Sequence, residues 1–205
     1  MAVTAKRLND SKSGKTLNIG VVYQKMIKAK NSRRYQKKAV SANDKGADGK
    51  SERVLILDNI RSVINVGAIF RTADAIGISK IYLTGYTPEP VDRFGRIRGD
   101  FVRASLGADK NVEWESVGRA EKIIYRLKKL KFQIIAVEQA SNSVDYKKIK
   151  VGKRMAIIIG NEVNGISKNI LRAANIVAEI PMLGRKESLN VSVAAGIFLF
   201  RVFDR

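Results

Sequence analysis

Apolar residues in the last three quarters of the chain fall into two repeating patterns. Short runs that are almost wholly apolar are typical of strands buried on both faces of a sheet. Such runs occupy residues 54–57, 81–83, 132–137, 155–159 and 176–180. Between them, apolar residues recur at helical spacing at Val66, Ile69, Phe70, Ala73 and Ile76, and later at Ile123, Ile124, Leu127 and Leu130. Alternating strands and helices predict an α/β fold with a mostly parallel sheet and helices on both faces.

Local sequence signals mark where some of these segments begin and end. Gly77 is expected to end the first helix, and Ser167 is expected to cap a short helix that runs to about Ala174. Residues 87–103 contain two prolines and several basic residues. We expect a loop over this range.

The last expected helix, over residues 190–203, has almost no polar face. A helix that is apolar all round must be buried on more than one side. It either enters the centre of one core or lies between two subunits. Its place at the end of a small domain favours the subunit interface.

The charge of the chain is strongly positive and unevenly spread. Lys and Arg number 39 against 19 acidic residues, a formal net charge of +20. Residues 1–50 hold 13 Lys and Arg and three acidic residues. This distribution predicts a basic arm over residues 1–52, flexible or partly helical, followed by a more balanced globular domain over residues 53–205.

An excess of positive charge favours a polyanionic partner. An anionic membrane surface would attract the same charge, but no strongly amphipathic basic helix stands out. No apolar run is long enough to span a bilayer, and the N-terminus lacks the apolar stretch of a secretory signal. We therefore expect a cytoplasmic protein that does not bind a membrane.

The sequence contains neither Cys nor His. Disulfides, thiolate zinc sites and a cysteine nucleophile are thereby excluded, and the most common general base is missing. Any catalysis must use carboxylates, amides, hydroxyls, Lys or Arg, and we expect no metal.

Three segments combine polar residues with the ends of expected strands. They are residues 59–73, 159–166 and 180–194. Ligands of open α/β sheets bind at the carboxyl ends of strands, so each segment is a candidate for the site. Taken singly, each also fits a simpler interpretation, because Arg71 can pair with Asp74 and Asn65, Ser188 or Asn190 can serve as an ordinary helix cap.

The combination and order of these segments resemble the three motifs of the SpoU (TrmH-type) family of RNA methyltransferases. The resemblance covers about residues 53–203 and includes the linking stretch over residues 104–109. Residues 188–192 are its most specific part. It implies a trefoil-knotted C-terminal region, S-adenosylmethionine (AdoMet) bound in the knot, and an active site at a homodimer interface.

The resemblance also assigns roles to residues of this sequence. It implies that the polar side of the site is ordered by Asn65, Glu162, Ser188 and Asn190, and that the cofactor pocket is lined by Val137, Gly160, Ile180, Met182 and Leu189. Arg71 matches the arginine that the family is proposed to use to activate a ribose 2′-hydroxyl. Because a guanidinium stays protonated, we predict instead that Arg71 binds the adjacent phosphate and stabilises negative charge developing on the 2′-oxygen.

The expected function is therefore AdoMet-dependent 2′-O-methylation of tRNA or rRNA. The basic arm is expected to track RNA phosphates through Lys25, Lys28, Lys30, Arg33, Arg34, Lys37 and Lys38. A disordered solubilising tail is the alternative for the arm. The alternatives for the chain are methylation of a base nitrogen, or a catalytically inactive RNA-binding or assembly factor.

Overall fold

The structure is a computed structural model that describes residues 51–203. Its seven strands form one sheet in the order β3-β2-β1-β6-β4-β7-β5, and every neighbouring pair is parallel. The strands are β1 (Glu52–Asp58), β2 (Lys80–Thr84), β3 (Glu113–Val117), β4 (Gln133–Val137), β5 (Val144–Asp145), β6 (Arg154–Ile159) and β7 (Ile176–Glu179). The five apolar runs in the sequence all correspond to strands of this sheet.

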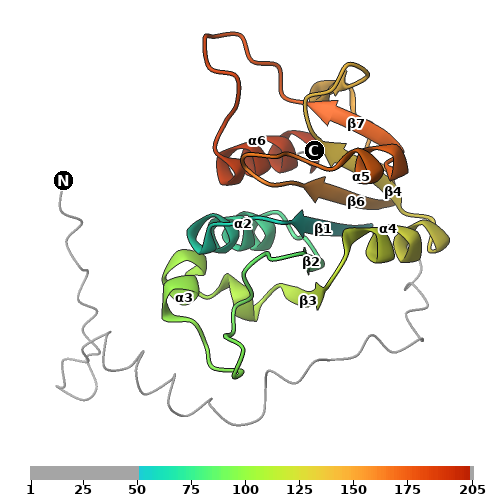
Figure 1. Cartoon of the computed structure of the whole chain (residues 1–205). Coiled ribbons are helices and arrows are strands. Elements are labelled where there is room, and N and C mark those ends of the chain that lie inside the picture. Colours follow the sequence, from blue (N-terminus) through green and yellow to red (C-terminus); the bar gives the residue numbers. More distant parts are fainter. Residues whose placement is uncertain (1–50, 204–205) are drawn as a thin grey trace, which may run out of the picture. The chain divides into compact units, whose positions relative to one another are not determined.

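Five α-helices connect or follow the strands (Figure 1). They are α2 (Val63–Ala75), α3 (Gly99–Ser105), α4 (Ala120–Lys129), α5 (Lys168–Ala173) and α6 (Val191–Phe203), with short 3-10 turns at Ala108–Lys110 (η1) and Tyr146–Lys148 (η2). Ser167 caps α5, as expected, because its side chain accepts a hydrogen bond from the Ile170 N–H. The prediction of a loop over residues 87–103 was wrong for its last part, because α3 begins at Gly99.

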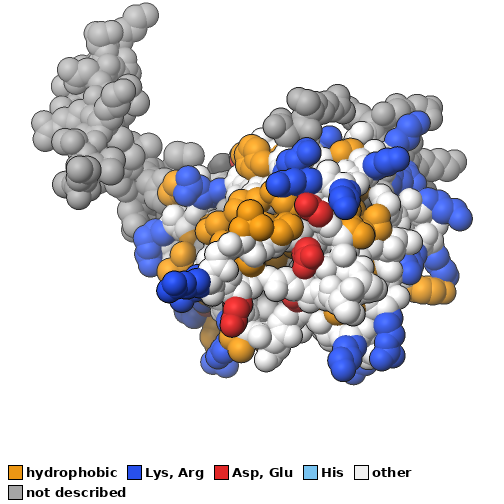
Figure 2. All heavy atoms as spheres, turned by 90° about the horizontal axis from the view of Figure 1, so that it is seen from above, with side chains coloured by type: hydrophobic (Ala, Val, Ile, Leu, Met, Phe, Trp, Pro, Cys, Tyr) orange, Lys and Arg blue, Asp and Glu red, His pale blue; other side chains and the backbone are white. Residues whose placement is uncertain are grey.

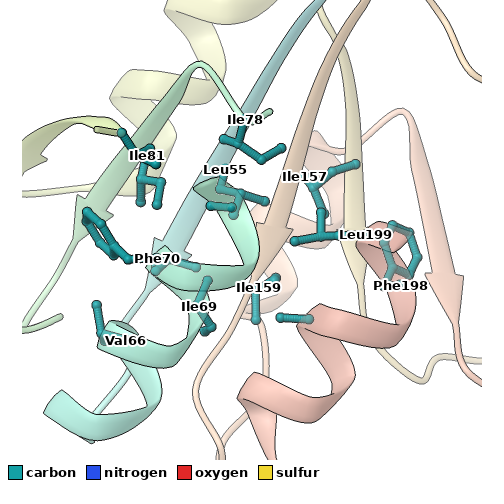
Figure 3. Packing of buried hydrophobic residues seen from close by; sticks show 14 of the residues in the cluster. Leu55, Val66, Ile69, Phe70, Ile78, Ile81, Ile157, Ile159, Phe198 and Leu199 are labelled. Atoms are coloured by element: carbon teal, nitrogen blue, oxygen red, sulfur yellow. The ribbon is translucent and has the colours of Figure 1, made fainter. Parts of the chain in front are cut away.

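The sheet has a separate apolar core on each face. One core contains α2 and α6 side chains packed on Leu55 and Leu57 of β1, whereas Val54 and Ile56 of β1 face the other core, which contains α4 and α5 side chains. This is the alternation that a strand buried on both faces produces. Figure 3 shows the first core, where residues of α2, β6 and α6 point toward one another. The predicted fold class is confirmed.

Within the described part of the chain, helix α6 is buried on one face only. Its Val191, Ala195, Phe198, Leu199, Val202 and Phe203 are buried in the first core. By contrast, Val193, Ile197 and Phe200 are exposed on the opposite face. The helix therefore does not enter the centre of a single core, and its second apolar face has no partner in the described part of the chain. No helix in residues 51–203 is long and apolar enough to cross a membrane.

Candidate active site

The site lies where the direction of the sheet connections changes. Strands β1 and β6 are neighbours, but the helix that follows β1 (α2) covers one face and the helix that follows β6 (α5) covers the other. The two carboxyl ends therefore form a topological switch point, the place where ligands of open α/β sheets bind. Two of the three polar segments predicted from the sequence begin at these two strand ends.

A chain of hydrogen bonds joins polar residues from all three segments. The Glu162 Oε1 accepts a hydrogen bond of 3.0 Å from the Asn65 Nδ2, and its Oε2 accepts one of 3.2 Å from the Arg61 N–H. The Asn65 Oδ1 in turn accepts a hydrogen bond of 3.2 Å from the Asn190 Nδ2. Three of the predicted catalytic residues, 97 and 125 positions apart along the chain, are thus brought together.

Each member of this network is fixed from its own segment. The Asn190 Oδ1 accepts hydrogen bonds from the Ser192 N–H (2.9 Å) and Oγ (2.6 Å), so Asn190 caps the first turn of α6. The N-cap of α2 is Ser62, whose Oγ accepts the Asn65 N–H at 3.3 Å. The possibility that Asn65 itself caps this helix is therefore wrong, and its amide is free to face Glu162.

Arg71 and Ser188 lie outside this network. Both are exposed, and neither side chain takes part in a hydrogen bond or ion pair with another residue in the described part of the chain. The alternative pairing of Arg71 with Asp74 is not present, since the Asp74 carboxylate accepts the Asn111 Nδ2 at 3.1 Å. An unpaired guanidinium on α2 is available for an anionic ligand.

The network keeps Glu162 ionised. Burial would raise its pKa, but hydrogen bonds from the Asn65 amide and from the backbone N–H groups of Glu162, Arg61 and Ser62 outweigh burial and lower it. Both carboxylate oxygens are occupied as acceptors. Glu162 is therefore suited to orient Asn65 and not to take up a proton.

Replacing Glu162 with Gln should show the effect of this lowered pKa on the pH dependence of stability. A lowered pKa in the folded state stabilises the protein above the ordinary Glu value of 4.5, and this contribution is lost as the pH falls through the folded-state pKa. The Gln variant should be less stable than the parent at pH 7, by up to about 1 kcal/mol for a partly exposed group. The difference should close as the pH falls below 4.5 and passes through the folded-state pKa of Glu162. Urea unfolding at several pH values measures it, and a difference independent of pH would contradict the assignment.

The predicted cofactor residues occupy neighbouring strand ends. Val137 ends β4, Gly160 follows β6 and Ile180 follows β7, and β4 lies between β6 and β7 in the sheet. Met182 and Leu189 lie in the loop that leads from β7 to α6. That loop is tied to the end of β4, because the Gln139 Nε2 donates to the Glu187 carbonyl at 2.7 Å.

Two further polar residues shape this edge and were not predicted as site residues. Asn161 is only 7% exposed; its Nδ2 donates to the Asn59 carbonyl and the Tyr86 hydroxyl, and its Oδ1 accepts two backbone N–H groups of the next turn. The Glu138 Oε2 accepts the Ile166 N–H at 2.9 Å. Glu138 follows β4 directly and Asn161 follows β6 after one glycine, and this place after a buried strand was the signal available for them. Within residues 51–203, no group of three or more acidic, His or Cys residues is placed to hold a metal ion.

Comparison with known proteins agrees with this geometry. The model of the SpoU rRNA Methylase family matches residues 52–200. The chain belongs to this family. The match spans the sheet, the hydrogen-bonded network and most of α6, so the resemblance seen in the sequence is confirmed.

Individual relatives are similar over the same region. A protein of Staphylococcus saprophyticus assigned to the TrmH family of tRNA/rRNA methyltransferases is 34% identical over 159 residues, which are 78% of this chain and 61% of the relative. The AdoMet-bound rRNA methyltransferase of Sinorhizobium meliloti is 34% identical with a TM-score of 0.68, over 75% of this chain and 56% of that one. The A. aeolicus TrmH/SpoU tRNA modifying enzyme is 30% identical with a TM-score of 0.66, over 75% and 74%. The chain thus spans somewhat less than two thirds of the S. saprophyticus relative's length.

Proposed function

We propose that this SpoU-family protein transfers a methyl group from AdoMet to a ribose 2′-hydroxyl of tRNA or rRNA. The observation that carries the proposal is the Glu162–Asn65–Asn190 network at the change of direction between β1 and β6. It lies beside the strand ends that hold the predicted cofactor residues. The AdoMet-bound S. meliloti neighbour supports the choice of cofactor.

The residues present suit AdoMet. Val137, Ile180 and Met182 are half-buried apolar side chains at one edge of the sheet, next to backbone groups of the loops that leave β6 and β7. Such a surface can hold an adenine ring and the methionine chain of the cofactor, with Gly160 and Leu189 completing the set. When bound, AdoMet supplies an electrophilic methyl group on a sulfonium.

The protein's own residues would position the RNA and manage the charge. Glu162 holds Asn65, and Asn65 holds Asn190, so the two amides are fixed before the substrate arrives. Arg71 would bind a phosphate next to the target ribose and stabilise the negative charge that grows on the 2′-oxygen as its proton leaves. Ser188 would contribute a hydroxyl from the loop before α6. The proton would pass to phosphate or water.

The exposed face of α6 supports a homodimer. Val193, Ile197 and Phe200 lie on it, and exposed apolar patches of this kind mark protein interfaces. Figure 2 looks onto the side of the domain where β7 and α6 lie in Figure 1, and apolar side chains gather near its middle with Lys and Arg around them. Because Asn190 caps the same helix, a second subunit on α6 would lie close to the network.

Replacing Ile197 with Glu should convert the dimer to a monomer and abolish most of the methyl transfer. The substitution places a charge in the middle of an apolar face that the partner would desolvate. Sedimentation equilibrium gives the mass, and Tyr125→Glu on the exposed surface of α4 is the matched control. A parent protein with the mass of one chain would refute the dimer. A dimeric Ile197 variant would show that the interface does not lie on this face of α6.

The remaining sequence predictions complete the proposal. The RNA-binding role assigned to the arm rests on residues 25–38, which lie outside the described residues. The trefoil knot is proposed from the family, and a cytoplasmic location fits an RNA substrate. The boundary between arm and domain at residue 52 is likewise a prediction.

The experiment that tests the function uses purified protein, labelled AdoMet, and total tRNA or rRNA in separate reactions. Mass spectrometry of the digested RNA then identifies the modified nucleoside. A labelled 2′-O-methylnucleoside supports the proposal and names the RNA class. Label in a base would overturn the ribose assignment. AdoMet binding without transfer to either RNA would favour the inactive RNA-binding factor.

A further inference from the structure

The connection from β2 to α3 folds into a tight hairpin that the proposed chemistry does not use. Val91 and Ile97 form an antiparallel bridge at its base. Above the bridge, the Asp92 N–H donates to the Arg96 carbonyl at 2.8 Å and the Gly95 N–H donates to the Asp92 carbonyl at 2.9 Å. Gly95 has a φ of +75°, the left-handed conformation that the turn requires and that glycine adopts without strain.

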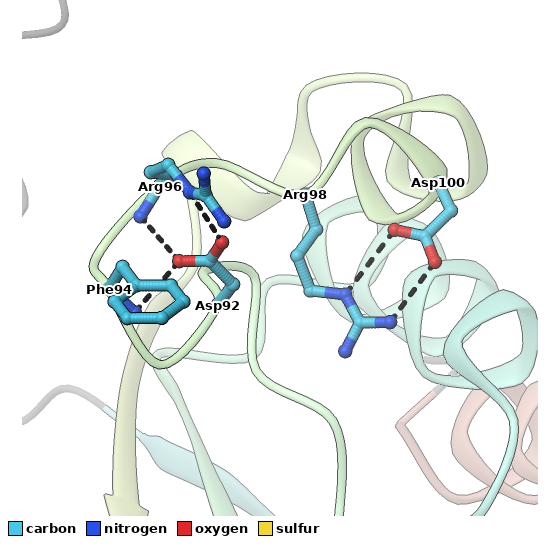
Figure 4. A network of polar contacts seen from close by, with 5 residues as sticks. All are labelled: Asp92, Phe94, Arg96, Arg98 and Asp100. Carbon is cyan, nitrogen blue, oxygen red and sulfur yellow. Dashed lines mark hydrogen bonds and ion pairs between the residues drawn. The ribbon is translucent and has the colours of Figure 1, made fainter.

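A carboxylate inside the turn holds its tip in one conformation. The Asp92 Oδ1 accepts the backbone N–H groups of Phe94 and Arg96, each at 2.9 Å, and its Oδ2 accepts the Arg96 Nε at 2.7 Å (Figure 4). At the far end, Arg98 forms two hydrogen bonds with Asp100 at the start of α3. The hairpin is thus fixed by its own polar contacts, without a packed core beneath its tip.

This rigid turn displays an aromatic ring next to two cations. Phe94 is 64% exposed, although a side chain of this type is usually buried. The Arg93 guanidinium carbon lies 4.7 Å from the ring centroid, and that of Arg96 lies 5.0 Å from it. Arg96 is neutralised by Asp92, whereas Arg93 has no carboxylate partner in the described part of the chain.

We propose that Phe94 and Arg93 form a contact site for an unpaired nucleotide of the RNA substrate, with the base stacked on Phe94 and its phosphate bound by Arg93. An aromatic ring with a flanking guanidinium is the combination that binds single-stranded nucleic acid irrespective of base. A turn fixed beforehand loses little conformational entropy on binding. This inference rests on the proposed RNA substrate.

The position of the hairpin fits this role. It leaves the carboxyl end of β2, and β2 is the parallel neighbour of β1, so hairpin and polar network start from the same edge of the sheet. An RNA strand held at the network can therefore extend toward the hairpin. The contact would select substrates with an unstacked nucleotide near the modified ribose.

Binding of the full chain to two probes tests the proposal. One probe is a fluorescently labelled oligouridylate, and the other is an oligomer of equal length with abasic nucleotides. Phe94→Ala should weaken oligouridylate binding by about fivefold or more, because fivefold corresponds to the lower end of the stacking energy of one base. Binding of the abasic probe should not change. Phe94→Tyr should restore the parent affinity. Arg93→Gln should weaken the binding of both probes and reduce the number of counterions released on binding by about one.

Tyr125→Ala is the matched control, because Tyr125 is also an exposed aromatic residue beside a cation, Lys129, but lies on α4. It should change neither affinity. The stacking site would be overturned if Phe94→Ala lost equal affinity for both probes, or lost no affinity for oligouridylate. Unchanged AdoMet binding shows that the variant is folded.

The outcome is separable from that of the proposed function. If the parent protein transfers no methyl group, the proposed function fails while the binding comparison still decides the role of Phe94. If methyl transfer occurs, Phe94→Ala should raise the KM for RNA by at least the same factor and leave kcat nearly unchanged at saturating RNA. Active enzyme with an unchanged KM would refute this inference alone.

Discussion

Methyl-transfer activity of the Arg71→Lys variant should fall by about 100- to 1,000-fold in kcat, the loss typical of removing one transition-state donor. Arg71 is exposed on α2, without an ion pair in the described part of the chain, and stands in the segment whose Asn65 belongs to the network. Lys keeps the positive charge but cannot form the planar, two-pronged contact that a guanidinium makes with a phosphate. AdoMet affinity should not change, because the predicted cofactor residues lie at the carboxyl ends of β4, β6 and β7 and in the loop that follows β7.

Single-turnover methylation with saturating RNA measures this effect, and calorimetric titration with AdoMet provides the second readout. Arg172→Lys, an equally exposed exchange on α5, is the control and should behave like the parent. Turnover close to that of the parent in the Arg71 variant would remove Arg71 from the site. A parallel loss of AdoMet binding would instead assign it to the cofactor.

Most of the sheet was predictable because buried parallel strands are nearly continuous in apolar residues. Residues 54–57 and 155–159 are such strands, and they lie next to each other in the middle of the sheet. β3 was harder to recognise, since Glu113–Val117 mixes charged and apolar residues at the sheet edge. The short β5 pairs only with β7 and carries almost no pattern of its own.

Helix α3 shows why the rest was not predictable. It has seven residues, fewer than two turns, and follows a loop rich in Pro and Arg. Tertiary contact stabilises it: the Phe101 ring packs edge-on against the Phe70 ring of α2, with centroids 5.2 Å apart. Local sequence does not encode such a contact between residues 31 positions apart.

The sequence predicted which residues belong to the site but not the hydrogen bonds that connect them. The sequence identified Asn65, Glu162 and Asn190 through family resemblance, and the structure shows that they form one hydrogen-bonded chain. It did not reveal that Ser62 caps α2, or that the buried side chain of Asn161 makes four hydrogen bonds next to the network. Those contacts depend on where β1 and β6 end relative to each other, which is set by sheet order and not by spacing.

Substituting Ala for Gly160 should damage both stability and cofactor binding. Gly160 is buried directly after β6, and a Cβ there would collide with the Ile166 side chain and would lie 2.9 Å from the carbonyl carbon and 3.0 Å from the carbonyl oxygen of Gly165. The side chain can rotate, but the backbone is held, because the Gly165 N–H donates to the Asn161 carbonyl and the Ile166 N–H donates to Glu138. Relief of the collision must therefore displace the turn that carries Asn161 and Glu162.

We expect the Gly160→Ala variant to lose about 1–3 kcal/mol of unfolding free energy, as overpacked buried sites do. Its AdoMet affinity should fall by about tenfold, equivalent to about 1.4 kcal/mol. Gly118→Ala is the control, because that glycine is exposed and its Cβ would meet nothing within 4 Å. Urea unfolding and AdoMet titration of both variants decide the matter. A Gly160 variant that binds AdoMet like the parent would show that the turn after β6 does not form part of the cofactor site, whereas loss of binding at full stability would place Gly160 in direct contact with the cofactor.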